Sequence, residues 1–291
     1  MSVSRHGALV ALIAGACIIG LAPIFMRLSP IGPAATTFWR MLLAIPALWA
    51  WRAWSARGHE TRVDDGRAGT WIIVAGLLLG LDLVIWHASI HLTSVANATV
   101  MANLSPVFVV LFAAVLFRTR PRGVFLIGMT AAIGGAVTMA LASARGDGAG
   151  HVRGDCLALC SAASYAGYLM VVERLRHVRT TSVIMCGAAI ASAAALAPVA
   201  LVLEPDAFMP ADAVGWLPLI GLALIVHVIG QGLITYAFAQ LPASFGAIAL
   251  LIQPVVAAAL AWIWFGEAVG LQQCAGAVAI LAGIVIAKRA G

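Results

Sequence analysis

The sequence predicts an all-α polytopic membrane protein, with ten transmembrane helices arranged as two inverted five-helix repeats. Of its 291 residues, 63% are hydrophobic and only 10% are charged, whereas soluble domains carry about 25% charged residues. The apolar segments are long and lack the two-residue alternation of a membrane β-barrel. A third observation, a sequence pattern that recurs later in the chain, indicates the repeats.

Two stretches of the chain repeat one another, beginning near residues 92 and 240. Pro106 and Pro254 are 148 residues apart. The same separation relates three further pairs: Phe117 with Phe265, Gly128 with Gly276, and Gly135 with Gly283. We therefore expect a duplicated unit, with residues 1–145 as the first five-span repeat and 146–291 as the second, within one membrane domain.

Ten segments are long and apolar enough to cross a bilayer, whose core of about 30 Å requires ~20 apolar residues per helix. The first of them resembles a signal peptide, but the similar segments that follow favour a retained span. Short polar or Pro/Gly-containing turns separate the segments. The expected spans are residues 8–28, 33–53, 70–90, 94–117, 123–143, 154–173, 181–203, 213–238, 243–265 and 270–287.

The positive charges fall mostly on one side of this arrangement. With the N-terminus assigned to the cytoplasm, thirteen of the 17 Lys and Arg residues lie on the cytoplasmic side, and three lie opposite. This bias predicts that both termini are cytoplasmic, in a cell inner membrane. The net charge of +6 therefore indicates orientation in a lipid bilayer, and no nucleic-acid-binding pattern accompanies it.

Five spans per repeat is an odd number, so the second repeat enters the membrane upside down. Inverted repeats are typical of secondary transporters, with the substrate site near the bilayer midplane between the halves. Two similar halves of opposite orientation can exchange conformations, which turns an inward-open cavity outward. The sequence therefore predicts alternating access of a small-molecule substrate through a central cavity.

These features resemble the drug/metabolite transporter superfamily and, within it, the EamA-type ten-span exporters. The resemblance covers nearly the whole chain and is carried by LSPVFVVLFAAVLF, by IQPVVAAALAWIWFGE, and by Arg40 early in the second span. Two positions depart from the family pattern, namely Gln253 in place of a glutamate and Arg118–Thr119 in place of a Gly-Glu pair. The resemblance implies export of amino acids and other small metabolites, and YddG-like aromatic amino-acid exporters are similar. It also implies that the last spans of the two repeats pack together.

Arg40 and Asp82 are the charged residues predicted well inside spans. A charge at the centre of a membrane helix costs about 2.5–3.5 kcal/mol on insertion scales, so such residues are functional candidates. At 1.5 Å per residue, both lie about 10–12 Å from the same surface. They are predicted either to form a structural ion pair or, for Asp82, to bind substrate or a proton.

Further substrate-binding candidates follow helical spacing. Asp82 and Trp86 share a helix face, as do His227 and Gln231, and His87 lies nearer the outer surface. The remaining candidates are uncharged groups for hydrogen bonding or cavity walls, and each has an interhelical packing role as its alternative. They are Asn97, Met101, Ser105, Tyr165, Tyr168 and Gln253.

Pro106 and Pro254 interrupt backbone hydrogen bonding in matching spans and are predicted kink or gating positions. The sequence contains no nucleotide-binding or hydrolase motif and no metal-ligand cluster, so we expect no catalytic residue, metal or cofactor. The alternatives to a secondary transporter are a membrane-embedded lipid-modifying enzyme and a protein that translocates lipids or drugs. The substrate, its coupling to protons, and the choice between monomer and homodimer stay open.

Overall fold

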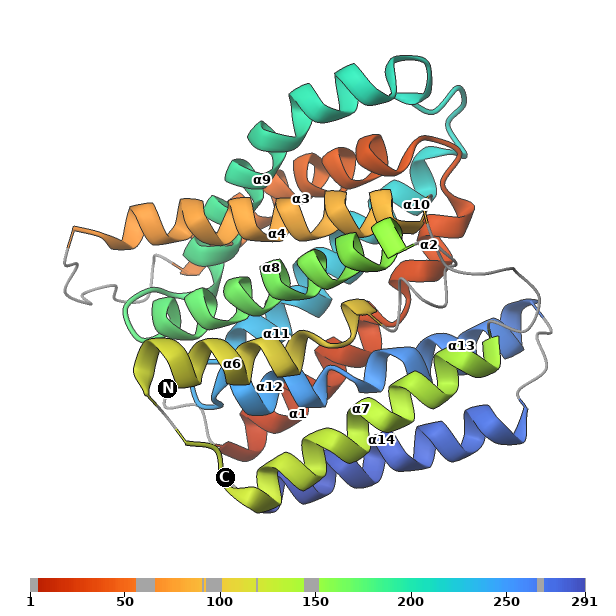
Figure 1. Ribbon diagram of the computed structural model, residues 1–291. Coiled ribbons are helices and arrows are strands. Elements are labelled where there is room, and N and C mark those ends of the chain that lie inside the picture. Colours follow the sequence, from red (N-terminus) through yellow and green to blue (C-terminus); the bar gives the residue numbers. More distant parts are fainter. Residues whose placement is uncertain are drawn as a thin grey trace.

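The computed structural model is a bundle of helices (Figure 1) and describes residues 5–55, 66–90, 92, 101–118, 120–143, 152–265 and 270–290. The helices of the first repeat are α1 (Arg5–Ile19), α2 (Ala22–Leu28), α3 (Pro33–Ser55), α4 (Ala68–Ile90), α6 (Ser105–Phe117) and α7 (Gly123–Ser143). Those of the second are α8 (Val152–Arg176), α9 (Thr181–Leu203), the 3-10 turn η1 (Pro205–Ala207), α10 (Trp216–Gly221), the π-helical η2 (Leu222–Gln231), α11 (Gly232–Ala237), α12 (Ala243–Ala249), α13 (Ile252–Phe265) and α14 (Leu271–Ala290).

The helices coincide with the predicted spans, but several spans are not continuous. The expected helix 8–28 breaks between α1 and α2, two residues before Pro23, and the expected helix 243–265 breaks between α12 and α13, before Pro254. Proline lacks the N–H that would continue the backbone ladder. In the fourth span, α6 likewise starts with Pro106 in its first turn, and residues 94–100 lie outside the described residues.

Five helical stretches are each long and apolar enough to cross a membrane, within the part of the chain that the structure describes. They are Arg5–Met26, Ala68–Trp86, Cys156–Arg176, Thr181–Leu203 and Trp216–Ala237. Shorter apolar helices accompany them at Ser105–Leu116, Gly123–Thr138 and Cys274–Ala287.

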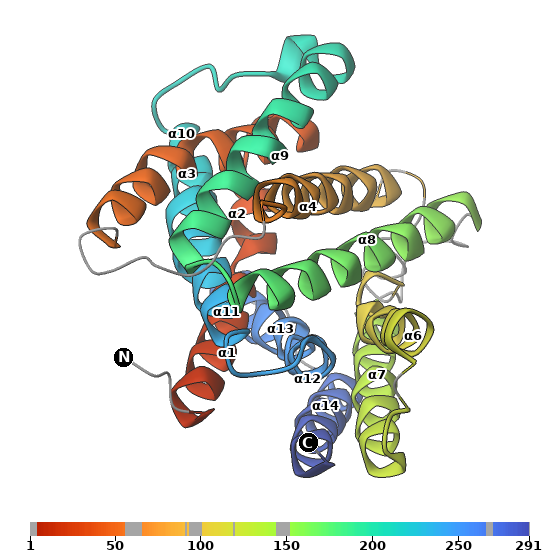
Figure 2. The ribbon, with the colours of Figure 1, turned by 90° about the vertical axis from the view of Figure 1, so that its left-hand side faces the viewer.

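Helices α7 and α14, the last of each repeat, lie side by side along the edge of the bundle (Figures 1 and 2). Their glycines meet reciprocally: a Cβ on Gly128 would lie 2.7 Å from the Gly283 oxygen, and a Cβ on Gly283 would lie 2.5 Å from the Gly128 oxygen. Further along, a Cβ on Gly135 would lie 2.5 Å from the oxygen of Gly276. The helices are therefore antiparallel, and repeat-equivalent residues exchange places across the contact, as a two-fold axis in the membrane plane requires.

The other helices obey the same symmetry. The second spans of the two repeats, α3 and α9, pack on each other, and α4 packs on α8 as the equivalent η2 and α11 pack on α1. The first span of each repeat thus contacts the third span of the other. The described chain begins and ends on one side of the bundle (Figure 1), which we call the termini side.

Candidate functional site

A group of polar side chains lies inside the otherwise apolar bundle, where α3 and α4 of the first repeat face α8 and η2 of the second. We call it the central polar cluster. Its members are Arg40, Asp82, Ser161, Tyr165, Tyr168, His227 and Gln231. Polar groups are rare at membrane depth and usually face a bundle interior or a water-filled cavity. The cluster is therefore the candidate substrate site.

The Asp82 carboxylate is held by a hydroxyl from the other repeat. Ser161 Oγ on α8 donates to Asp82 Oδ1 on α4 at 2.6 Å. The two helices carrying them pack closely, and Leu78 of α4 contacts Gly167 of α8, where a Cβ would lie 3.3 Å from the leucine methyl. A charge-assisted bond of this length fixes the position of the carboxylate.

Ser161, Tyr165 and Tyr168 occupy one face of α8, at i, i+4 and i+7 spacing. The two tyrosine rings stack with centroids 5.8 Å apart and an interplanar angle of 22°. Gln231 Nε2 of η2 donates to the Tyr168 hydroxyl at 3.1 Å, and the same amide interacts with the Tyr165 hydroxyl. This face of α8 joins the third span of the first repeat to that of the second.

Arg40 and His227 are buried in the cluster, with exposed fractions of 8% and 1%. Among the described residues, neither Arg40 Nε nor either imidazole nitrogen of His227 has a hydrogen-bond partner. The guanidinium lies within Coulombic range of the Asp82 carboxylate and of the His227 imidazole. No salt bridge joins Arg40 to Asp82, both of which the structure describes, so the two charged groups of the predicted ion pair are not in direct contact.

His227 and Gln231 both lie in η2, a segment of ten residues with π-helical hydrogen bonding. π-helical turns are rare and occur frequently at functional sites. Both side chains are buried, so η2 directs two polar groups into the core from a span that is otherwise apolar.

The remaining predicted site residues are placed as follows. Trp86 is half-buried one turn beyond Asp82, and its carbonyl accepts a 2.6 Å hydrogen bond from Ser89 Oγ. Ser105 is buried, Met101 and Gln253 are half-buried, and no hydrogen bond between described residues joins their side chains to the cluster. Asn97 and the side chains of His87 and Pro254 lie outside the described residues.

Sequence reasoning missed Ser161, because a serine within CSAAS is indistinguishable from a small packing residue. Its i, i+4 spacing to Tyr165 was the available signal. It also missed Thr235, whose Oγ1 donates to Met185 Sδ at 3.3 Å behind Tyr168, and which interacts with the Tyr168 hydroxyl.

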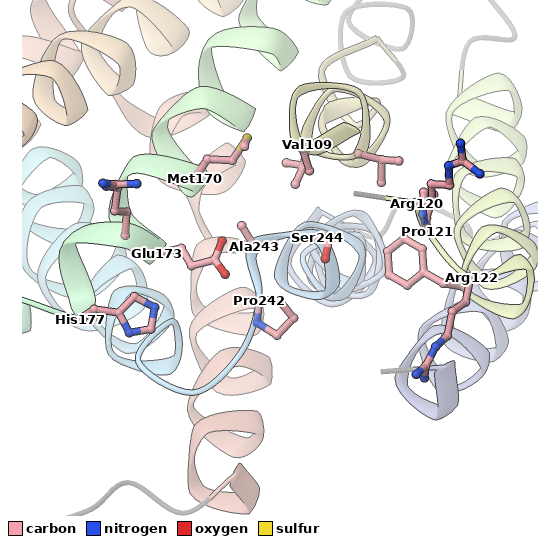
Figure 3. Close-up of a pocket in the computed structure, with 14 residues that line it drawn as sticks. Val109, Arg120, Pro121, Arg122, Met170, Glu173, His177, Pro242, Ala243 and Ser244 are labelled. Atoms are coloured by element: carbon pink, nitrogen blue, oxygen red, sulfur yellow. The ribbon is translucent and has the colours of Figure 1, made fainter. Parts of the chain in front are cut away.

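A pocket of about 580 Å³ opens on the termini side between α6, the start of α7, the end of α8 and the start of α12. Figure 3 shows Arg120 and Arg122 on one wall, and Glu173 and His177 on the other. Glu173 points toward α12 and accepts a hydrogen bond from the backbone N–H of Ala243. With Arg174 also in its lining, the pocket carries an excess of positive charge.

Aromatic side chains pack at the opposite side of the bundle. Trp39, which precedes Arg40, donates from its indole Nε1 to the Phe208 carbonyl at 2.8 Å. Its ring packs edge-on against Trp216 at 4.8 Å and against Phe38 at 5.2 Å. The chain between α9 and α10 is thereby fastened over α3 on this side.

Glu204 fastens the same region through backbone groups. Its carboxylate accepts hydrogen bonds from Ala34 N at 3.1 Å and Ala35 N at 2.8 Å. These are first-turn amides of α3 with no partner inside the helix, and a negative charge there is favoured by the helix dipole.

Within the described residues, no group of three or more His, Cys, Asp or Glu side chains is placed to hold a metal ion. The chemistry that the central polar cluster offers is hydrogen bonding and charge recognition by groups from both repeats.

Comparison with known proteins agrees with this geometry. The model of the EamA-like transporter family matches the chain twice, over residues 6–141 and 152–288. The pseudopaline exporter CntI from two strains of Pseudomonas aeruginosa is 27% identical over 221 residues, which covers 75% of this chain and 74% of the exporter. A protein of known crystal structure shares the fold, with a TM-score of 0.82, 21% identity and 98% of each chain covered.

The double match bears out the two repeats, and the family consists of transporters, which excludes the alternative of a lipid-modifying enzyme. The chain is a multi-pass membrane protein and a secondary transporter, and it belongs to the EamA-like transporter family.

Proposed function

We propose that this transporter exports zwitterionic metabolites of the amino-acid class from the cytoplasm. The observation that carries the proposal is the central polar cluster, in which both repeats contribute polar groups to one buried position. A site between inverted repeats is open to one side or the other as the halves rearrange. Export of pseudopaline by the similar CntI protein supports this direction of transport.

Asp82 is the residue that we assign to the substrate ammonium group. Its carboxylate is oriented by Ser161. Trp86 lies one turn away, and the stacked rings of Tyr165 and Tyr168 provide apolar area with polar tips for the rest of the molecule. Aromatic amino acids are the members of the class that this environment favours.

The termini side is the cytoplasmic side in this proposal, because most of the Lys and Arg residues lie there. The pocket beside Glu173 then serves as the cytoplasmic entrance, and the aromatic contacts of Trp39 close the periplasmic side of an inner-membrane protein.

Efflux from liposomes tests the function. Purified protein is reconstituted into vesicles loaded with labelled amino acids, and efflux is followed with and without a pH gradient. We expect efflux of at least one aromatic amino acid, lost in Asp82→Asn and retained in Asp206→Asn, which neutralises an exposed carboxylate in η1. If no amino acid leaves the vesicles, the proposed substrate class is wrong. Efflux that is independent of the gradient would remove Asp82 as a proton carrier.

A further inference from the structure

We propose that Arg40 and His227 form an anion subsite that binds the carboxylate of the exported metabolite, across the cluster from an ammonium subsite at Asp82. This assignment rests on the proposed function and specifies its substrate class, because a molecule must carry a carboxylate to engage both ends of the site.

Both side chains carry buried nitrogen atoms that have no hydrogen-bond partner among the described residues. Buried polar groups in proteins nearly always have hydrogen-bond partners, and each exception requires an explanation. Arg40 Nε and both nitrogens of His227 lack one among the described residues, although both residues are more than nine-tenths buried. Two side chains of one cluster whose buried nitrogens lack a hydrogen-bond partner among the described residues indicate a ligand that binds and dissociates.

The chemistry of the two side chains indicates which class of ligand would bind them. Arg40 carries a full positive charge with donors only, in a planar fork that matches a carboxylate. His227 interacts electrostatically with that charge. A cation would be repelled by the guanidinium, whereas a carboxylate supplies acceptors for both residues at once.

Asp82, the acidic residue of the cluster, does not neutralise Arg40 by direct contact. Asp82 accepts from Ser161 and forms no salt bridge with Arg40, although the structure describes both residues. The opposite charges therefore remain separate, as two ends of a site for a molecule with an ammonium group and a carboxylate.

Arg40 and His227 belong to different repeats. Arg40 belongs to α3 and His227 to η2, and these elements pack on one another. A carboxylate bound by both would bridge the repeats, so its arrival and departure would change the contact that must rearrange during transport. The arginine-lined pocket on the termini side would also concentrate anions at the entrance.

The test compares three probes that share one ring and differ only in charged groups: phenylalanine, 3-phenylpropionate and phenethylamine. Their binding to the full chain in lipid nanodiscs is measured by ligand-induced thermal stabilisation. We expect 3-phenylpropionate to stabilise the wild-type protein through Arg40 and His227, phenethylamine to do so through Asp82, and phenylalanine, which engages both subsites, to stabilise it at the lowest concentration.

The variants Arg40→Gln and His227→Asn should weaken binding of both carboxylate probes by roughly tenfold to a hundredfold, as expected for lost charge-assisted hydrogen bonds. Asp82→Asn should keep 3-phenylpropionate binding. Arg40→Lys keeps the charge without the fork, and should retain part of the affinity if Arg40→Gln does not fold. Matched controls are Arg52→Gln, an exposed arginine in the last turn of the same helix, and His6→Asn, exposed in α1.

Two results would overturn the subsite: unchanged carboxylate binding in Arg40→Gln and His227→Asn, or no stabilisation by either carboxylate. These results are distinct from failure of the proposed function. If amino acids leave the liposomes but binding does not depend on Arg40, the export function holds and the subsite is wrong. If binding depends on Arg40 but no amino acid leaves the liposomes, the subsite holds and the export function is wrong.

Discussion

Ser161 shows how much depends on a single hydroxyl in this bundle. Asp82 lies at membrane depth, where an ionised carboxylate is costly, by about 2.5–3.5 kcal/mol on insertion scales. A hydrogen bond to a charged group contributes about 1.5–3 kcal/mol, which is of the same size. The 2.6 Å bond from Ser161 therefore offsets much of the cost of holding Asp82 in the membrane, and it ties α8 to α4.

Replacing this serine should destabilise the protein. We expect Ser161→Ala to lower the free energy of unfolding by about 1–3 kcal/mol, because the half-buried carboxylate loses its donor. Thermal unfolding in detergent would register this as a lower Tm. Ser164→Ala is the matched control, since Ser164 lies on the same helix and its hydroxyl donates to the Cys160 carbonyl of that helix, at 3.0 Å. Equal Tm values for the two variants would contradict a supporting role for Ser161.

At the scale of elements, contacts between helix ends organise the two sides of the bundle. Glu204, just beyond α9, caps the start of α3, and Glu173, near the end of α8, accepts from Ala243 at the start of α12. Both carboxylates supply acceptors for amides that have no partner inside their own helix. Both glutamates belong to the second repeat. The two contacts are chemically similar, but the repeat symmetry does not relate them to each other.

Glu204→Ala should loosen the start of α3. Loss of a helix cap costs about 0.5–2 kcal/mol, and the effect should be local. Hydrogen exchange should accelerate at the amides of Ala34 and Ala35 while the amides in the middle of α3 stay protected. Asp206→Ala, at an exposed carboxylate two residues along, should leave exchange at the start of α3 unchanged, and acceleration in that control would argue against a specific cap.

The contact between α7 and α14 makes a second prediction at this scale. A methyl group on Gly128 would lie 2.5 Å from Ala287 N and 2.7 Å from the Gly283 oxygen, both backbone atoms that cannot swing away. Gly128→Ala should therefore force the helices apart and cost about 1–3 kcal/mol of unfolding free energy. Gly134→Ala on the same helix, with nothing within 4 Å of its added Cβ, should be neutral or slightly stabilising in the same thermal unfolding measurement.

For the whole molecule, orientation in the membrane is the property with the widest consequences. Export requires that the arginine-lined pocket face the cytoplasm. Reporter fusions test this directly: green fluorescent protein should fluoresce at both the N- and C-terminus, and alkaline phosphatase should be inactive at both. Active phosphatase at either terminus would contradict the proposed topology.

Much of this architecture could be predicted, because a bilayer restricts what the chain can do. Long apolar segments must be helices, and Pro33, Gly123 and Thr181 start helices where turn residues indicated. The echo of Gly128 and Gly135 in Gly276 and Gly283 indicated the repeats. In the site, Arg40, Asp82 and His227 were identifiable as polar groups in apolar segments.

The remainder depends on three-dimensional contacts. A hydropathy pattern does not distinguish an α-helix from the π-helical η2, so the way His227 and Gln231 face the cluster was not predictable. The break between α1 and α2 was missed although Pro23 was visible, since proline is tolerated inside many membrane helices. Ser161 acquires its role only because α4 brings Asp82 opposite to it.

The reciprocal meeting of Gly128 and Gly283 has a further consequence for genetic change. Because each residue occupies the space that the other would need, the costs of Gly128→Ala and Gly283→Ala should not add: once one methyl has separated the helices, the second enters a gap that already exists. A double-mutant cycle should show a coupling energy of about 0.5–3 kcal/mol, in the direction that makes the double variant more stable than the sum predicts. The two positions, 155 residues apart in the chain, would then vary together as one unit, and a larger residue at one of them would relax selection on the other.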